Sequence, residues 1–418
     1  MENQLRKKAM AAFGAGLKAA DPAHALKKAV AKHPFPTPKQ GGKRVFIAIG
    51  KAAISMMREA LAEKSDVPFS AFAVTNYENA QDLSGVEVIA AGHPVPDESG
   101  LKATKRVAEL AENAEIHDEV IVLISGGGSA LLPAPRGGLS LTEKMQINDL
   151  LLKNNLEITD MNLVRQNLSF LKGGKLAALA APAPVTAYIL SDVIGDDLNV
   201  VASGPTANLI GNPSDAKNLL KKHGLWDQIP DSAKLILSDN KGVQLVDNKV
   251  NNILIGSNQF AAQAMAKEAG ATFCPEPLEG EVSKAVATCL KRIAQEDMRK
   301  PFALAWGGET TVKVTGSGKG GRNQEFALRF AIAAEQENFE GNWCFLSGAT
   351  DGRDGPTDAA GGLVDAGTLK RIQESGNELQ TYLDNNDSYH ALENAGDLID
   401  IGATGTNVAD LQLFIFAP

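Results

Sequence analysis

Short, wholly apolar runs, each followed at once by a glycine-containing turn, most constrain what this chain can fold into. The first run covers residues 45–49, and Gly50-Lys51-Ala52-Ala53 follows it directly. After this turn, Ile54, Met57 and Leu61 recur at the spacing of one helix face. A short, fully apolar strand is typical of a parallel sheet that is covered on both faces. The sequence therefore predicts a strand, a tight turn and a helix here.

The same unit recurs along the chain and sets the expected fold class. Ser140-Leu141-Thr142-Glu143 is a capping box, which predicts the start of a helix that runs to about Asn154. The alternation of strands with helices predicts an α/β protein of two domains with largely parallel sheets. The further apolar runs that we predict as strands cover residues 71–74, 86–90, 119–124, 185–190, 252–256, 302–306, 343–347 and 411–416.

The length of the chain, 418 residues, is too great for one ordinary hydrophobic core. We expect one domain over residues 1–240 and a second over residues 245–418. The first would include a helical start over residues 1–33, which reads as two helices interrupted at Asp21-Pro22. Proline cannot continue a helix, since it lacks a backbone N–H.

The composition narrows the classes of partner. Apolar residues make up 44% and charged residues 22% of the chain, as in globular proteins. The net charge of -9 argues against a nucleic-acid partner and disfavours an anionic membrane surface. The sequence has neither a run of about 18 apolar residues nor the apolar core of a signal peptide at its start. We therefore expect no membrane span and a cytoplasmic location.

The three cysteines do not suggest a disulfide framework or a zinc site. Cys274, Cys289 and Cys344 are widely spaced, odd in number and form no CxxC pair. We predict that they are buried and behave as small hydrophobic residues.

The densest functional signal is a glycine-rich segment over residues 316–325, followed by a helical pattern over residues 326–334. Glycine lets backbone N–H groups turn toward a ligand, and a helix start adds further N–H donors. Lys319 and Arg322 add cations, and the arginine fork matches phosphate oxygens. The segment therefore predicts a phosphate-binding loop. A glycine-rich turn whose cations point at water is an equally weighted alternative.

Two other glycine-rich turns suggest a nucleotide without fitting a standard motif. Gly50-Lys51 is followed by alanine, which does not fit the Walker A pattern. The stretch 126–131 fits the dinucleotide pattern only in part, because Leu131 replaces its third glycine. Lys51 stands in a tight strand-to-helix turn, which favours a role as a point charge for phosphate or carboxylate over that of a surface lysine.

Carboxylates follow two of the predicted strands. Residues 192–197 hold three aspartates, and residues 351–358 hold three more. Carboxylates at strand ends suit Mg²⁺, which takes one or two of them together with phosphates. Most of the six are expected to serve in turns or caps, and one or two to contact metal or substrate. Glu309 and Asn407 also stand next to strand ends, as candidate ligand contacts or as ordinary surface and turn residues.

Taken together, these motifs resemble the glycerate 2-kinase family, the MOFRL-type (class II) glycerate kinases that were long labelled hydroxypyruvate reductases. The resemblance covers nearly the whole chain, and the ordered set of motifs is far more specific than any one of them. It rests on the motifs beginning at Gly50, Ser125, Leu171, Ser191, Ser203, Gly307, Gly320, Thr350, Asp354 and Gly405.

The resemblance implies a Rossmann-like N-terminal domain and a C-terminal α/β/α domain of the MOFRL type, with the active site in the cleft between them. It implies ATP- and Mg²⁺-dependent phosphorylation of D-glycerate on its 2-hydroxyl, giving 2-phosphoglycerate. Family members place a catalytic lysine where this chain has Lys51 and a catalytic arginine where it has Arg322.

The resulting hypothesis assigns Lys51 and Arg322 to the transferred phosphoryl group. Asp192 and Asp351 are candidates for binding Mg²⁺ or for accepting the hydroxyl proton. An NAD(P)H-dependent hydroxypyruvate reductase and a non-catalytic nucleotide or metabolite sensor remain alternatives. A homodimer is one option, and the residues leave the oligomeric state open. The candidate nucleotide contacts are Ser125, Gly126, Gly127, Gly128, Ser129, Lys319, Glu309 and Asn407.

Overall fold

The computed structural model describes residues 2–63, 65–239, 248–376 and 378–418. The chain forms two compact units. The unit that we call the N-terminal unit comprises Ala25–Ser191 and Gly195–Ile255. The C-terminal unit comprises Met1–His24, Asp192–Ile194 and Gly256–Pro418. This division differs from the predicted ranges 1–240 and 245–418, because the first helix belongs to the C-terminal unit and strand β6 to the N-terminal one.

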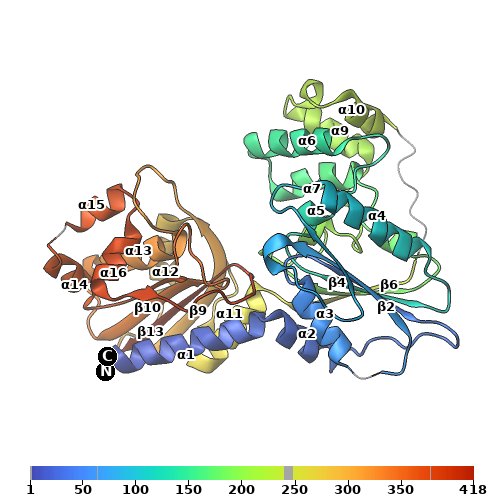
Figure 1. Ribbon diagram of the computed structural model, residues 1–418. Helices are drawn as coiled ribbons and strands as arrows, with labels where there is room; N and C mark the ends of the chain where they lie inside the picture. The colour runs from blue at the N-terminus through green and yellow to red at the C-terminus, as the bar shows by residue number, and fades with distance from the viewer. Residues whose placement is uncertain (1, 64, 240–247, 377) are drawn as a thin grey trace. The chain divides into compact units, whose positions relative to one another are not determined.

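The N-terminal unit is built on a sheet that has six strands in the described part of the chain, in the order β3-β2-β1-β4-β5-β6 (Figure 1). The pairs from β3 to β5 are all parallel. The order reverses between β1 and β4, as in doubly wound nucleotide-binding folds, whose ligands lie at this reversal. The strands are β1 Arg44–Ile49, β2 Phe69–Asn76, β3 Glu87–Ala91, β4 Glu119–Ile124, β5 Val185–Leu190 and β6 Val250–Gly256.

The predicted strands of this sheet are confirmed, and all residues of β1 are buried. Parallel strands need crossovers, and here these are mainly helices. The first crossover contains α3, the helix that was predicted from the spacing of Ile54, Met57 and Leu61. The helices and short 3-10 turns of this unit near the sheet are α2 Pro22–Val30, α3 Ala53–Ala62, η1 Tyr77–Asn79, α4 Glu98–Glu112, α5 Gly128–Leu131, α8 Lys175–Leu179 and η2 Val201–Ser203.

A helical layer of the same unit has its own hydrophobic core. It contains α6 (Leu141–Lys153), α7 (Ile158–Asn167), α9 (Pro213–Lys222) and α10 (Asp231–Ser238), with η3 (Trp226–Gln228) between the last two. Its core residues include Leu151, Val164, Leu220 and Leu237. The capping box predicted at the start of α6 is confirmed, since the Ser140 side chain accepts from the Glu143 N–H and the Glu143 carboxylate accepts from the Ser140 N–H.

The C-terminal unit contains a mixed sheet, so the expectation of a largely parallel sheet is wrong for this unit. Within the described residues the strand order is β12-β11-β10-β13-β9-β7, and β8 also pairs with β9. β13 pairs antiparallel with β9 and β10, and β10 antiparallel with β11. An apolar run that is buried on both faces carries no sign of its direction. The strands are β7 Thr272–Phe273, β8 Leu278–Glu281, β9 Phe302–Thr311, β10 Asn342–Ala349, β11 Gly361–Asp365, β12 Leu398–Ile399 and β13 Asp410–Ala417.

Helices cover both faces of this sheet (Figure 1). Along β10, Phe345 stacks on Phe330 of α13, whereas Gly348 faces the ring of Phe13 in α1. These two strand positions point to opposite faces, because strand side chains alternate. The helices of the unit are α1 Glu2–Ala20, α11 Asn258–Ala269, α12 Val282–Ile293, α13 Arg322–Gln336, α14 Thr368–Glu374, α15 Leu379–Asp384 and α16 Ser388–Ala395.

The first helix, α1, belongs to this sheet because its apolar face is buried there. Ala9, Ala12 and Phe13 are fully buried. Arg6 forms an ion pair with Asp365 of β11 at 2.6 Å. Local periodicity identifies such a helix but not the distant strands that bury it.

The three cysteines are buried and free, as predicted. None of the helices that the structure describes combines the length and the apolar character needed to cross a membrane.

Candidate functional site

In the N-terminal unit, the turns after β1 and β4 begin side by side, because Ile49 and Ile124 are register partners. The Lys51 N–H donates to the Gly126 carbonyl at 2.9 Å. Ser125 Oγ accepts the Ala52 N–H at 3.0 Å and donates to the Ile49 carbonyl at 3.4 Å. The Ser125 side chain thus joins the two turns rather than facing a ligand.

Glycines in these turns are required by close packing. Gly50 has φ +122°, and a Cβ atom there would overlap Ser125. A Cβ atom on Gly128 would lie 2.8 Å from Ala202 Cβ. The small residues therefore allow the end of β1, the loop after β4 and η2 to approach one another.

The loop after β4 presents a run of unpaired backbone donors. Within the described part of the chain, the N–H groups of residues 126–129 have no protein acceptor. Gly127 is in the left-handed conformation, with φ +84°. Consecutive N–H groups around a left-handed residue form a concave surface that binds anions. This loop retains the donors that the sequence analysis assigned to nucleotide phosphates.

Lys51 lies next to this loop and is half-buried. Among the described residues its Nζ makes neither a hydrogen bond nor an ion pair. Its carbonyl accepts hydrogen bonds from Thr75 Oγ1 at 3.3 Å and Asn79 Nδ2 at 3.0 Å, which fix the backbone of the turn. The ammonium group is therefore available to an anion, and its role in phosphate binding stays a prediction.

The sequence analysis missed His93. A Cβ atom on Gly127 would lie 3.1 Å from His93 Cδ2 and 3.2 Å from Lys51 Cγ, so both side chains flank the loop. Burial lowers the pKa of His93, and the charge of Lys51 lowers it further. A histidine that stands alone in the sequence gives no signal of this placement.

Asp192 stands two residues after the end of β5, at the first position of a short segment that belongs to the C-terminal unit. It is half-buried. Asp197 of the same acidic segment serves a turn, because its Oδ1 accepts from the N–H and the Nδ2 of Asn199. The role predicted for Asp192 stays a prediction.

In the C-terminal unit, Arg322 is the first residue of α13 and is held by two carboxylates. Its Nε and Nη2 donate to Asp410 at 2.6 and 2.9 Å. Its Nη1 lies 3.1 Å from Glu309 Oε1. Burial alone would lower the pKa of Arg322, but Asp410 and then Glu309 outweigh it and the net pKa is raised. Asp410, the fully buried first residue of β13, was missed by the sequence analysis.

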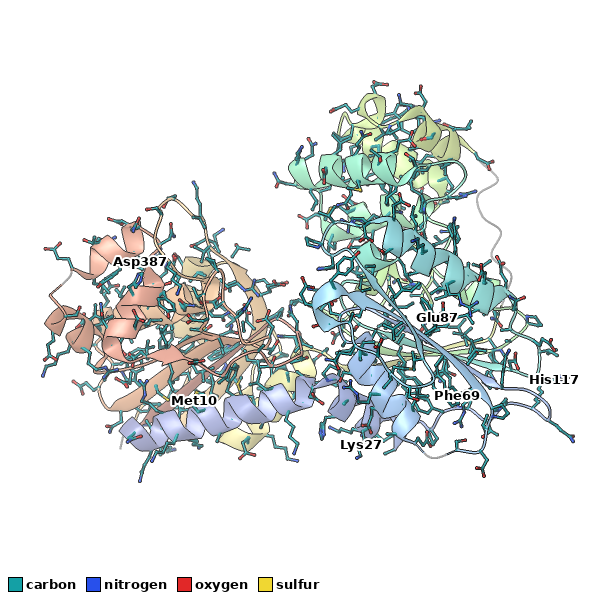
Figure 2. The ribbon with its side chains drawn as sticks, viewed as in Figure 1. Met10, Lys27, Phe69, Glu87, His117 and Asp387 are labelled. Atoms are coloured by element: carbon teal, nitrogen blue, oxygen red, sulfur yellow. The ribbon has the colours of Figure 1, made fainter. Side chains whose placement is uncertain are left out.

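In the glycine-rich loop before α13, the N–H groups of residues 315–319 have protein acceptors, whereas those of residues 320–322 have none among the described residues. Asn386 Oδ1 accepts from the N–H groups of Thr315 and Gly316 at 2.7 and 3.0 Å. The Lys319 N–H donates to Asp387, which Figure 2 labels, at 2.9 Å. A Cβ atom on Gly318 would lie 2.5 Å from Asp387 Cβ. The glycines there let the loop pack against the turn between α15 and α16.

Two of the N–H donors at the N-terminus of α13 are taken by a side chain of the protein. The Asp354 carboxylate accepts the N–H groups of Asn323 and Gln324 at 3.1 and 2.8 Å. Burial raises the pKa of Asp354 to about 7 against the effect of these donors. The N–H groups of Asn323 and Gln324 are therefore taken, whereas those of residues 320–322 have no acceptor among the described residues. The phosphate contact at this helix start stays a prediction.

Three further candidates have visible local partners. Lys319 Nζ lies 3.6 Å from the centre of the Tyr389 ring and 3.5 Å from Asp358. Asn407 is exposed, and its Oδ1 accepts the Ala409 N–H at 3.1 Å, as in a turn. Asp351 Oδ1 accepts the Arg353 N–H at 2.9 Å, which leaves acceptor capacity on the carboxylate.

The carboxylates do not form a preassembled metal centre. In the portion of the chain that the structure describes, no group of three or more histidine, cysteine, aspartate or glutamate side chains is placed to hold a metal ion. Mg²⁺ usually takes only one or two carboxylates and completes its shell with water and substrate phosphates. The roles of Asp351 and Asp192 in binding Mg²⁺ stay predictions.

The site residues thus form two groups. The structure brings Lys51 and residues 125–129 together in the N-terminal unit, and it brings Arg322 and Glu309 together in the C-terminal unit.

Comparison with known proteins agrees with the motifs. The chain matches the domain of unknown function DUF4147 over residues 8–238 and the MOFRL family over residues 302–410. A Thermotoga maritima protein named D-glycerate 2-kinase is 41% identical over 88% of this chain and 89% of its own length. A Pyrococcus horikoshii protein named glycerate 2-kinase is 38% identical over 96% of this chain and 95% of its own length.

A crystal structure of a Thermotoga maritima glycerate kinase superposes with a TM-score of 0.89 and 38% identity, and covers 99% of this chain and 100% of that one. An Agrobacterium vitis relative named putative hydroxypyruvate reductase is 35% identical over 96% of this chain and 92% of its own length. The matches span both halves of the chain at identities well above 30%. The chain therefore belongs to the glycerate 2-kinase family and is a kinase.

Proposed function

We propose that this protein transfers the γ-phosphoryl group of ATP to the 2-hydroxyl of D-glycerate, with Mg²⁺, to give 2-phosphoglycerate and ADP. The observation that carries the proposal is the pair formed by Lys51 and the loop of residues 126–129. The unpaired N–H groups of that loop lie beside an unpaired ammonium group at the reversal of strand order. The names of the relatives support glycerate as the acceptor.

In this proposal, the N-terminal unit holds the phosphates of the donor. The loop N–H groups bind nucleotide phosphate oxygens, and the ammonium group of Lys51 binds the same phosphates. The lowered pKa of His93 favours a neutral imidazole, which can donate to a phosphate or accept the hydroxyl proton of the substrate. Donors that are fixed before the reaction stabilise the transition state without reorganisation.

Arg322 is proposed to stabilise the charge on the transferred phosphoryl group. The guanidinium has five N–H donors. Asp410 and Glu309 together use three of these donors and fix the plane of the guanidinium. One donor on Nη1 and one on Nη2 remain for a ligand. Phosphoryl transfer depends mainly on such positioning and on charge stabilisation. Glu309, which was expected to contact the nucleotide, is better explained as a residue that orients Arg322.

Mg²⁺ would be held by Asp192 or Asp351 together with the nucleotide phosphates. When bound, it would supply positive charge to the phosphate oxygens. Lys319 is proposed as a further phosphate contact, since its ammonium group is partly exposed. Asn407 is proposed to donate through its Nδ2, because its Oδ1 is already used. A cytoplasmic location and a homodimer complete the proposal.

Hydroxypyruvate reduction is the second candidate, because the strand order also suits a dinucleotide. The position of the third glycine of that fingerprint is Leu131, which is fully buried in the core. A leucine at this position disfavours the reductase, because the third glycine of the fingerprint allows the close packing that a dinucleotide site needs.

A coupled assay with ATP, Mg²⁺ and D-glycerate tests the proposal by measuring ADP and by separating 2- from 3-phosphoglycerate. Glycerate-dependent ADP together with 2-phosphoglycerate is the expected result. 3-Phosphoglycerate would contradict the assigned hydroxyl. NAD(P)H oxidation with hydroxypyruvate, in the absence of ADP formation, would replace the kinase with the reductase.

A further inference from the structure

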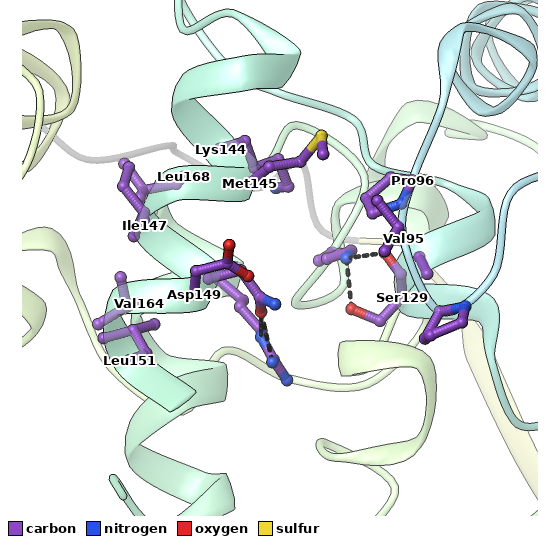
Figure 3. Close-up of a pocket in the computed structure, with 15 residues that line it drawn as sticks. Val95, Pro96, Ser129, Lys144, Met145, Ile147, Asp149, Leu151, Val164 and Leu168 are labelled. Carbon is purple, nitrogen blue, oxygen red and sulfur yellow. Dashed lines mark hydrogen bonds between the residues drawn. The ribbon is translucent and has the colours of Figure 1, made fainter. Parts of the chain in front are cut away.

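A cavity lies within the N-terminal unit, between the helical layer and the loop after β4 (Figure 3). Its volume is about 190 Å³. Helices α6 and α7 supply one wall, and the segment Pro94–Pro96 with Ser129 supplies another. Its apolar lining residues are Pro94, Val95, Pro96, Ala130, Met145, Ile147, Leu151, Val164 and Leu168.

Three cationic side chains also line this mostly apolar cavity. Lys172 Nζ donates to the carbonyl of Ser129 at 2.7 Å and to its Oγ at 2.6 Å. Arg165 donates to Asn148 Oδ1 from Nε at 3.0 Å. The Nζ of Lys144 is buried and has no hydrogen-bond partner in the described structure. A buried ammonium group without an acceptor is costly, and native proteins normally pair it.

The charges of these side chains are not balanced by acids. Burial lowers the pKa of Lys144 to about 7, and the charges of Arg165 and Lys175 contribute in the same direction. Burial also lowers the pKa of Lys172, with further effects from Lys144 and Arg165. Asp149 is the carboxylate among the described lining residues, and it is exposed and forms no ion pair with them. Acidic side chains of the described lining therefore do not neutralise these cations.

We propose that this cavity binds an organic phosphate monoester, with the phosphate held by Lys144, Lys172 and Arg165. A phosphate dianion suits a cavity lined by three cationic side chains better than a single carboxylate does, because it offers more charge and more acceptor oxygens. The apolar walls favour a ligand whose phosphate is attached to an apolar or aromatic group, which glycerate does not have. The inference does not depend on the proposed function.

The position of the cavity couples it to the loop that is proposed to bind nucleotide. Ser129 ends that loop, and its Oγ contacts both Lys172 Nζ and Ser203 Oγ, the latter at 3.1 Å. Ser203 Oγ in turn donates to Asn162 of α7 at 2.7 Å. A phosphate that draws Lys172 toward the cavity would act directly on Ser129.

Isothermal titration of the full-length protein with phenyl phosphate tests the proposal, with benzyl alcohol and inorganic phosphate as partial ligands. Lys144→Met removes the unpaired cation and keeps the length of the side chain. Lys153→Met, an exposed lysine at the other end of α6, is the matched control. Lys144→Met removes the cost of burying an unpaired ammonium group, so we expect this variant to fold. Lys144→Arg is a second variant, which keeps the charge.

We expect phenyl phosphate to bind the wild type and Lys153→Met alike, and Lys144→Met about tenfold or more weakly, since charged hydrogen bonds are among the strongest. Lys144→Arg should recover part of the affinity. Equal binding to the wild type and Lys144→Met would overturn the proposal, because the phosphate would then lie elsewhere, for example on the loop N–H groups. No binding at millimolar phenyl phosphate, or equal binding of benzyl alcohol, would also overturn it.

Discussion

Arg322 donates two hydrogen bonds to the carboxylate of Asp410, from Nε at 2.6 Å and from Nη2 at 2.9 Å. Asp410 is fully buried at the start of β13, and Arg322 begins α13. The pair joins two elements that lie far apart in the sequence. It also fixes the plane of the guanidinium before any ligand arrives.

Arg322→Lys should therefore lower turnover strongly even though it keeps the charge. A lysine cannot form the two-point contact with Asp410 while its remaining donors face a phosphoryl group. Loss of an arginine that stabilises phosphoryl transfer costs roughly 10³–10⁵ in rate in other enzymes. Steady-state kinetics should show the loss in kcat. Arg329→Lys, which alters the ion pair with Glu325 on the same helix, should stay near wild type. Similar kcat values for the two variants would contradict the role of Arg322.

Lys51→Met should remove an unpaired ammonium group from the phosphate loop with little effect on folding. Removal of one preorganised donor to a transition-state oxyanion costs about 10²–10³ in kcat in other enzymes. Lys43→Met removes an exposed lysine before the other end of β1 and serves as the control. Kinetics and thermal unfolding measured side by side separate the effects. If the loss of thermal stability of Lys51→Met accounted for its loss of activity, the role assigned to Lys51 would be wrong.

Gly127→Ala and Gly138→Ala form a matched pair, because the two glycines have φ +84° and +85°. Each substitution should cost about 1–3 kcal/mol of stability through backbone strain. Only at Gly127 would the new methyl group press on His93 and Lys51, whereas at Gly138 it meets nothing within 4 Å. Activity assays on both variants at a temperature where they are folded should show a loss for Gly127→Ala alone. An equal loss in both would mean that strain, not the site, is responsible.

Lys144 should make stability depend on pH. Its pKa is lowered to about 7 in the folded protein, whereas an unfolded lysine titrates near ~10.4. Between these values the unfolded chain binds more protons, so the contribution of Lys144 to the free energy of unfolding rises with pH, by at most about 1.4 kcal/mol per pH unit. The cations that interact with it, Arg165, Lys172 and Lys175, stay charged or titrate alongside it.

Urea unfolding of the wild type and Lys144→Met from pH 6 to pH 10 checks this expectation. Lys144→Met should be the more stable protein near neutral pH, and the two curves should converge as the pH approaches 10. Lys153→Met should follow the wild type throughout. Parallel curves for the wild type and Lys144→Met would show that the buried ammonium group does not have a lowered pKa.

The sequence by itself determined the local elements and the chemistry available at their ends. The apolar run of β1, the glycine turn with Lys51 and the capping box at Ser140 follow from periodicity and backbone rules that act within a few residues. Because the carboxyl ends of parallel strands meet at one edge, the turns after β1 and β4 could be expected to meet. The ordered motifs also carried the family resemblance.

Only the tertiary structure decided which donors remain free and which partners orient the cations. The glycine-rich loop before α13 has the composition of a phosphate loop, yet Asn386 and Asp387 take the N–H groups of Gly316 and Lys319. The N–H groups of residues 320–322 have no acceptor among the described residues. The loop after β4 looks similar in sequence, and its N–H groups have no acceptor among the described residues. The partnership of Arg322 with Asp410 and the unpaired Lys144 Nζ depend on chain packing between distant segments. Hydrogen bonding and burial are properties of such contacts, which local sequence rules do not encode.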